Sequence, residues 1–348
     1  MPLFRRRQKP HGDDGEAAAI DAFWTWWQAT GATETARAVA DREPQRVVND
    51  ISTHVRGMRA GLAWELGPGA TSAHLLVISP EGNPELRAVA RRWLRAAPPP
   101  SAEWEYADAR QPSSNLDDLT LDVGGRTVAL GEIIVQTQPA GSRLGVVMHH
   151  DVLSPLAEQD RQQIAFLALD NAVGEDVVET WLGTIEVSTE PPDQGVPLGK
   201  LADLVAAHRA AHLNEDGSPT WQLLQGDGPK GPLLALALVP LYPTIAAQHD
   251  NHVMVTVPYV DRTDHGFPSE PALEALRSFE DHLSNRLGGS GTLVASETSA
   301  GVRTLHYYVD STSSGAEVVA GAVTGWPDGT VRVVTAHDPG WQAVRHLA

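Results

Sequence analysis

The clearest hydrophobic pattern in the chain lies in residues 252–341. At its start, Val253, Val255 and Val257 alternate with other side chains over residues 252–260. A period of two is typical of a strand that packs one face against a core. We therefore expect a strand here, followed by elements that cover its apolar face.

The residues after this strand predict an amphipathic helix. Ser269 stands before Glu270 and Pro271, where a serine oxygen can accept hydrogen bonds from free amides and proline fits the first turn. Large apolar side chains then recur at steps of three and four residues, at Leu276, Phe279, Leu283 and Leu287. Gly288 follows, and glycine commonly ends a helix.

Further strands and a second helix complete the segment. The β-rich runs 292–298 and 303–309 flank Ser-Ala-Gly at 299–301, which predicts a hairpin. Along the run 303–309, odd-numbered and even-numbered side chains take opposite faces. Ser314 and Glu317 have the spacing of a capping box at a helix start. The order strand, helix, strand, strand, helix, strand predicts a ferredoxin-like βαββαβ sandwich with four antiparallel strands.

The preceding residues predict a second α+β domain with its own antiparallel sheet. Strand patterns occur at residues 128–137 and 144–149. A hairpin over residues 221–238 is expected after this domain, just before the C-terminal βαββαβ segment. The proline-rich segment TEPPDQGVP is the best candidate for a linker, and the polar N-terminus is expected to be disordered. We therefore divide the chain into a disordered N-terminus, an N-terminal α+β domain, a linker and a C-terminal ferredoxin-like domain, at residues 1–16, 17–188, 189–197 and 198–348.

Four aromatic side chains crowd one predicted helix near the N-terminus, at Phe23, Trp24, Trp26 and Trp27. They could form a face that binds a partner. The alternative, that they dock on the core of the first domain, is favoured because aromatic side chains dominate core burial.

Three short motifs in the last third of the chain carry a family resemblance. They are Gly-Phe-Pro at 266–268, Glu-Asp-His-Leu at 280–283, and Gly-Val-Arg at 301–303 followed by Tyr307. In this order they resemble the bacterial family called domain of unknown function 695. The resemblance implies a fold and favours a binding role, but it implies no reaction.

The predicted hairpin and the closing segment with Asp338 and Trp341 are also similar, more faintly, to the regulator of ribonuclease E activity B family. Members of that family are protein inhibitors of a ribonuclease. This second resemblance implies a regulatory protein that acts by binding another protein.

Charge and composition exclude several classes of function. The 348 residues carry a formal net charge of -18, so most of the surface repels a phosphate backbone and we expect no nucleic-acid partner. Cysteine is absent, which excludes disulfides and thiolate ligands. No apolar run approaches the about 18 residues of a membrane span, and no secretory signal is visible. We expect a cytoplasmic protein without a membrane partner.

The sequence offers one candidate catalytic group, His149-His150-Asp151, at the end of a predicted strand. Adjacent strand residues point to opposite faces, so the two histidines cannot both bind one ion while the strand stays regular. His208 and His212 share a helix face, but Arg209 stands where a zinc protease needs glutamate. Serine-hydrolase and phosphate-binding motifs are absent. We expect no metal and no cofactor.

A second candidate set lies in the C-terminal domain. If the helices cover one face of its sheet, the other face is open to a partner, and the polar and aromatic candidates are Arg303, Tyr307, Tyr308, Asp310, Asp338 and Trp341. The alternative is structural: Arg303 pairs with an acid and the tyrosines pack into the core.

The absence of catalytic signatures favours a non-catalytic interaction or regulatory module that binds another protein. The alternative is a hydrolase with a site in the interdomain cleft near His149, His150 and Asp151.

Overall fold

The computed structural model describes residues 13–123, 125–153, 155–228 and 230–348. Most of the N-terminus that we expected to be disordered, residues 1–12, lies outside the described residues, and helix α1 already begins at Asp13. The described residues form two compact units, one ending at Asp108 and the other beginning at Ala109.

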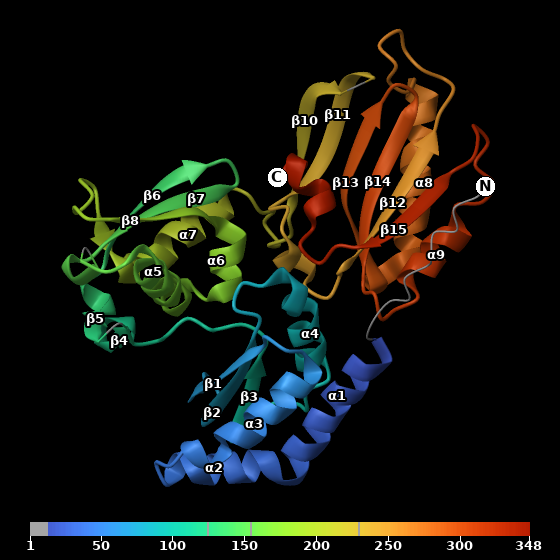
Figure 1. The fold of residues 1–348 in the computed structure, drawn as a ribbon. Helices are drawn as coiled ribbons and strands as arrows, with labels where there is room; N and C mark the ends of the chain where they lie inside the picture. The colour runs from blue at the N-terminus through green and yellow to red at the C-terminus, as the bar shows by residue number, and fades with distance from the viewer. Residues whose placement is uncertain (1–12, 124, 154, 229) are drawn as a thin grey trace, which may run out of the picture. The chain divides into compact units, whose positions relative to one another are not determined.

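The first unit packs helices against a three-stranded sheet (Figure 1). Strands β1 and β2 are antiparallel, and β3 lies parallel to β2. Asn83 accepts a hydrogen bond from the Glu85 amide at 3.1 Å and so caps α4. The elements are α1 (Asp13–Trp26), a π-helical turn (Trp27–Gly31), α2 (Ala32–Ala40), α3 (Gln45–Met58), β1 (Ala63–Pro68), β2 (His74–Ser79), α4 (Pro84–Arg95) and β3 (Trp104–Ala107).

The aromatic side chains of α1 and of the π-helical turn after it form the core of this unit. Phe23, Trp24 and Trp27 are buried, and Trp24 stacks on Trp93 of α4 with ring centroids 4.8 Å apart. The Trp24 indole also donates a hydrogen bond to the Trp93 carbonyl at 2.9 Å. The crowding of these rings therefore reflects core packing.

The second unit begins with a four-stranded sheet of order β8-β7-β6-β9. We expected an antiparallel sheet, but β8 runs parallel to β7. The reason is the pair of helices between them, which returns the chain in the same direction. The elements are β4 (Thr120–Val123), β5 (Arg126–Ala129), β6 (Ile134–Ala140), β7 (Arg143–His149), α5 (Glu158–Val173), α6 (Glu175–Trp181), β8 (Leu182–Ser188), β9 (Val196–Pro197) and α7 (Leu201–Ala210).

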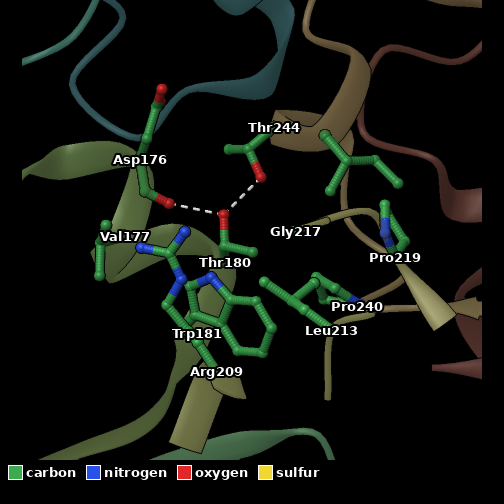
Figure 2. A pocket seen from close by; sticks show the side chains of 11 residues that line it. Asp176, Val177, Thr180, Trp181, Arg209, Leu213, Gly217, Pro219, Pro240 and Thr244 are labelled. Carbon is green, nitrogen blue, oxygen red and sulfur yellow. Dashed lines mark hydrogen bonds between the residues drawn. The ribbon is translucent and has the colours of Figure 1, made fainter. Parts of the chain in front are cut away.

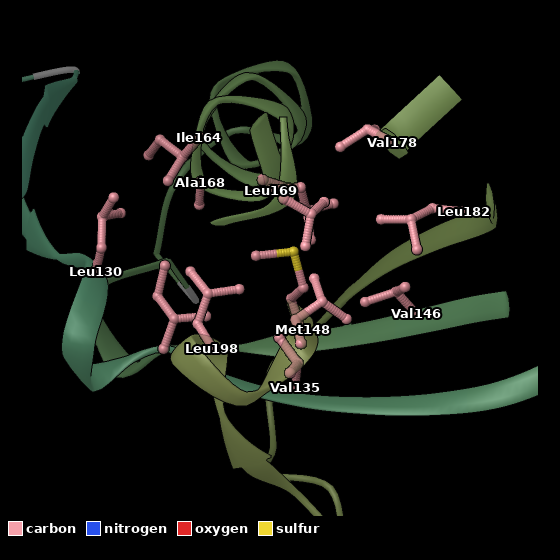
Figure 3. Close-up of a cluster of buried hydrophobic side chains, with 14 of the residues drawn as sticks. Leu130, Val135, Val146, Met148, Ile164, Ala168, Leu169, Val178, Leu182 and Leu198 are labelled. Atoms are coloured by element: carbon pink, nitrogen blue, oxygen red, sulfur yellow. The ribbon is translucent and has the colours of Figure 1, made fainter. Parts of the chain in front are cut away.

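This part has its own apolar core (Figure 3). Val135 and Met148 of the sheet face Ile164 and Leu169 of α5, and all four side chains are fully buried. Leu198, one residue beyond β9, closes the same cluster. The segment 189–197 therefore leads directly into this core, because β9 pairs with β6.

The rest of the second unit is a six-stranded sheet of order β10-β11-β13-β14-β12-β15, in which every neighbouring pair is antiparallel. Helices α8 and α9 pack on one face (Figure 1). The sheet has two strands more than expected, because the predicted hairpin before it joins β13. The elements are β10 (Thr220–Gly228), β11 (Gly231–Val239), β12 (Asn251–Pro258), α8 (Glu270–Leu287), β13 (Gly291–Ser299), β14 (Val302–Val309), α9 (Gly315–Ala322) and β15 (Arg332–His337).

Strand β13 contains a bulge at Val294. Leu293 pairs with Tyr307 of β14, whereas Ala295 pairs with His306, so one extra residue lies between the two pairs. A bulge of this kind shifts the alternation of side chains along the strand.

No helix among the described residues is long and apolar enough to cross a bilayer.

Candidate functional site

His149 lies at the end of β7. Its Nδ1 lies 3.2 Å from the Ser188 carbonyl oxygen, and its Nε2 lies 3.3 Å from Oδ1 of Asp151. The Asp151 side chain is 99% exposed, so water surrounds its carboxylate.

The neighbouring ring of His150 has different partners. Its Nδ1 accepts a hydrogen bond from the Val152 amide at 3.1 Å, and its Nε2 lies 3.5 Å from Oε2 of Glu132. The two imidazoles thus belong to separate contacts, and His150 lies just beyond the end of β7. Within the described part of the chain, no group of three or more histidine, aspartate or glutamate residues is arranged to hold a metal ion.

The second candidate set is split between the two faces of the six-stranded sheet. Arg303 of β14 lies on the face that α8 covers and forms a buried ion pair with Glu280. Its guanidinium also donates to Ser296 at 3.2 Å and Thr298 at 3.3 Å. Burial raises the pKa of Glu280, and the Arg303 charge opposes that shift.

Tyr307 is fully buried on the same face. Its hydroxyl donates to the Glu280 carbonyl at 3.2 Å and lies 3.3 Å from Oγ of Ser284. Burial raises the pKa of Tyr307 to about 12. Arg303 and Tyr307 therefore fasten the sheet to α8.

Tyr308, Asp338 and Trp341 come together on the opposite face. The Tyr308 hydroxyl donates to Oδ2 of Asp338 at 2.6 Å, and the Trp341 ring stacks on Tyr308 at 4.5 Å. The Trp341 indole donates to the His249 carbonyl at 3.0 Å, and the following 3-10 turn buries Val344. The C-terminal residues thus cover this part of the face that we expected to be open.

Asp310 lies apart from both groups, in the turn after β14. Its Oδ1 accepts hydrogen bonds from the Thr312 amide at 3.0 Å and the Thr312 hydroxyl at 2.7 Å. Together with Arg303, Tyr307, Tyr308 and Trp341 it is at most 9% exposed. A partner cannot reach Tyr307, Tyr308, Asp310 or Trp341 without displacing other residues.

A chain of imidazoles on the C-terminal face was missed in the sequence. His252 Nε2 lies 3.0 Å from His306 Nδ1, and His306 Nε2 lies 3.1 Å from Oε1 of Glu297. The exposed ring of His346 reaches the same oxygen at 3.2 Å. Burial lowers the pKa of His252 to about 4, with the charge of His306 adding to the shift. The hydrogen bond from His306 lowers the pKa of Glu297.

The register of the sheet brings these groups together. His252 pairs with Tyr308 across β12 and β14, which makes His306 its diagonal neighbour. The only signal in the sequence was the presence of histidine in two predicted strands, and their register could not be read from it.

An apolar groove of about 260 Å³ lies on the helix side of the sheet, where β10 and β11 extend beyond α8. Leu223, Leu234 and Leu236 line its strand side, and Leu273 lines its helix side. Arg303 is the one residue of the second candidate set that reaches this groove among its described lining residues.

A second pocket, of about 280 Å³, lies where α6 and α7 meet the loops that flank the β10–β11 hairpin (Figure 2). Trp181 and Arg209 line one side, with the guanidinium carbon 5.7 Å from the centre of the indole. Thr180 and Thr244 line another side, with their hydroxyl oxygens 2.5 Å apart. Sequence analysis noted Arg209 only as the residue that breaks a zinc motif.

Comparison with known proteins supports the first resemblance. Residues 236–346 match the family model described as "Family of unknown function (DUF695)". The match runs from within β11 to the C-terminal turn and so includes α8, β14 and Trp341. It does not include β10, α6 or α7. The similarity to the regulator of ribonuclease E activity B family is not shown.

No curated protein and no solved structure matched the chain.

Proposed function

We propose that this protein is a non-catalytic protein-binding module with a regulatory role. Its binding surface is the free edge of β10 together with the apolar groove beside it. The observation that carries the proposal is the exposure of Trp221 and Leu223, 46% and 55%, on this edge strand.

The fold of the matched region supports a binding role. We propose that β12, α8, β13, β14, α9 and β15 form a ferredoxin-like unit, to which the β10–β11 hairpin is added. The support is the strand order β13-β14-β12-β15 with all neighbours antiparallel, which is the order expected for this βαββαβ sandwich. Because the hairpin pairs with β13, the edge strand on this side of the sheet is β10, two strands beyond the unit that carries the helices.

Strand β10 has few of the features that keep an edge from pairing. Its nine residues, TWQLLQGDG, contain no lysine, arginine or proline, and β11 is its one strand neighbour in the described sheet. Natural edge strands are usually short, charged, bulged or covered. Trp221 and Leu223 are two positions apart and so project to one face, next to the groove.

The occupant we propose is an extended segment of another protein. It adds a strand to β10 by main-chain hydrogen bonds and places alternate apolar side chains in the groove. Arg277 is exposed at the rim of the groove, and Arg303 lies at its base. Because Arg303 is already paired with Glu280, the exposed Arg277 is the charge that favours a partner segment with a carboxylate among its apolar residues.

This proposal gives the second candidate set a divided role. Arg303 contributes to the groove, whereas Tyr307, Tyr308 and Trp341 make buried contacts on the two faces of the sheet and Asp310 stabilises the turn after β14. The hydrolase alternative at His149 has less support, since its imidazoles contact separate partners.

The test compares Leu223→Lys with Val334→Lys. Val334 is similarly exposed, at 53%, on β15 at the other edge of the same sheet, so it is a matched control. Proteins that bind the full chain in native extract are purified and titrated against both variants. We expect Leu223→Lys to weaken binding at least tenfold, because a lysine in the groove loses hydration without gaining a partner, and Val334→Lys to bind like wild type.

Hydrogen exchange on the purified complex provides the second measurement. We expect slower exchange along β10 and unchanged exchange along β15. A partner that binds Leu223→Lys as tightly as wild type contradicts the proposal. So does a dimer of the chain itself that Leu223→Lys dissociates, since the occupant would then be a second copy.

A further inference from the structure

The pocket beside Trp181 has one basic and one acidic lining residue, Arg209 and Asp176, and it lies outside the surface proposed above. Arg209 is exposed near the end of α7, and its guanidinium lies over the indole of Trp181. Among the described residues this stacking is the contact that Arg209 makes, with no ion pair to a carboxylate. The chain holds 44 acidic residues and only 26 lysines and arginines. In such an acidic chain, an arginine at a pocket without an ion pair to a carboxylate is unusual.

The walls of the pocket are mostly apolar. Leu213, Pro219 and Pro240 face the Trp181 ring across the space (Figure 2). A pocket of about 280 Å³ lies at or below the lower end of the roughly 300–1,000 Å³ typical of pockets for drug-sized ligands. The ligand is therefore small, with a flat or apolar body that fits against an indole.

The threonine pair sets a second requirement. The Thr180 hydroxyl donates to the Asp176 carbonyl at 2.5 Å, and a carbonyl can only accept. The one proton of Thr180 is thereby used, so in its 2.5 Å contact with Thr244 the Thr244 hydroxyl is the donor. Both protons point to protein atoms, and Thr244 offers a ligand only its lone pairs. A group that donates a hydrogen bond suits this side of the pocket.

We propose that this pocket binds a small aromatic carboxylic acid, with the carboxylate at Arg209 and the ring against Trp181. A hydroxyl on the ring can donate to Thr244. An arginine held on an aromatic face is well suited to a carboxylate, because its planar fork makes two parallel hydrogen bonds.

The experiment uses the full chain with benzoate, 4-hydroxybenzoate and uncharged benzamide, measured by calorimetry and by saturation-transfer NMR. We expect benzoate to bind at least tenfold more tightly than benzamide, and 4-hydroxybenzoate more tightly still. Arg209→Gln should weaken benzoate at least tenfold. Arg56→Gln, an exposed arginine of the other unit, changes the net charge equally and should leave binding unchanged.

Thr244→Val separates the two parts of the site. It should leave benzoate binding nearly unchanged and remove the advantage of 4-hydroxybenzoate. Equal binding of benzoate and benzamide, unchanged binding by Arg209→Gln, or no binding of any probe at millimolar concentration would overturn the proposal. Because Arg209 is exposed, its variant is expected to fold, and circular dichroism checks this.

Discussion

The two faces of the six-stranded sheet stabilise their buried polar groups in different ways. On the helix side, the charge on Arg303 meets the charge on Glu280 within an apolar layer. On the C-terminal side, aromatic rings and imidazoles are linked by hydrogen bonds, with Tyr308 bonded to Asp338 and His252 to His306. The stability of the helix side depends on keeping the Arg303–Glu280 ion pair intact. The stability of the C-terminal side depends on the protonation of its imidazoles.

Breaking the ion pair should have the largest effect. We expect Arg303→Met to lower the free energy of unfolding by about 3–5 kcal/mol, since it leaves a buried carboxyl without its partner. The Glu280 pKa, already raised by burial, would rise further. A carboxyl with a raised folded pKa favours folding only at low pH, so the loss should grow from pH 5 to pH 8.

Urea unfolding of Arg303→Met, and of the double variant Arg303→Met with Glu280→Met, checks this prediction. The double variant should recover most of the loss, because neither charge is then buried alone. A single variant that costs less than about 1 kcal/mol, with no dependence on pH, would show that water reaches Glu280 freely.

The imidazole chain should make the other face sensitive to acid. His252 has its folded pKa lowered to about 4, below the ordinary value near 6.5. The folded state therefore binds fewer protons than the unfolded state between these values, and stability present above pH 6.5 is lost as pH falls toward 4. We expect the loss to be about 2 kcal/mol after allowance for solvent screening.

His252→Gln should remove most of this dependence, as followed by urea unfolding at several pH values. His346→Ala is the control, because this ring is about half exposed and its contact with Glu297 is a surface ion pair. If His252→Gln keeps the slope of wild type between pH 6.5 and 4, other groups cause it.

Removal of a single hydroxyl should have the smallest effect. Tyr308→Phe deletes the bond to Asp338 but keeps the stacking on Trp341. We expect a loss of about 1–2 kcal/mol, measured by thermal unfolding. The effect should be small because Asp338 still accepts hydrogen bonds from the amides of Gln342 and Ala343. A loss as large as that of Arg303→Met would make the two faces equivalent.

Local patterns were enough to predict several elements of this sheet. The alternation of Val253, Val255 and Val257 is confirmed as β12, and Ser269 caps α8 by accepting from the Ala272 amide at 3.4 Å. The predicted division of the β14 side chains between two faces is also confirmed, with Arg303 on the helix side. Each of these depends on residues close in sequence.

One local signal gave a wrong prediction, because a neighbouring residue supplied the hydrogen bond at the start of α9 instead. Ser314 and Glu317 have the spacing of a capping box, but the Ser314 side chain makes no capping hydrogen bond. Ser313 accepts from the Gly315 amide at 3.1 Å instead, in a turn that Asp310 organises. Two serines in succession cannot be ranked by spacing alone.

The candidate sites depended on contacts between distant residues. Nothing near Tyr308 indicates that Trp341, more than thirty positions later, will stack on it. The groove beside β10 could not be predicted from the sequence. It exists because the hairpin pairs with β13 and not with another strand, and no local pattern indicates that pairing. Sequence could name Arg303 and Tyr308 as polar and aromatic, but it could not show which of them a partner can reach.

The bulge at Val294 determines which face of the sheet each later side chain of β13 occupies. Because of the one extra residue, Ser296 and Thr298 face α8 and bind Arg303, whereas Glu297 faces the other way and binds His306. With regular pairing, these three side chains would exchange faces, and both networks would lose a member at once. The single extra residue therefore decides the membership of both networks at once.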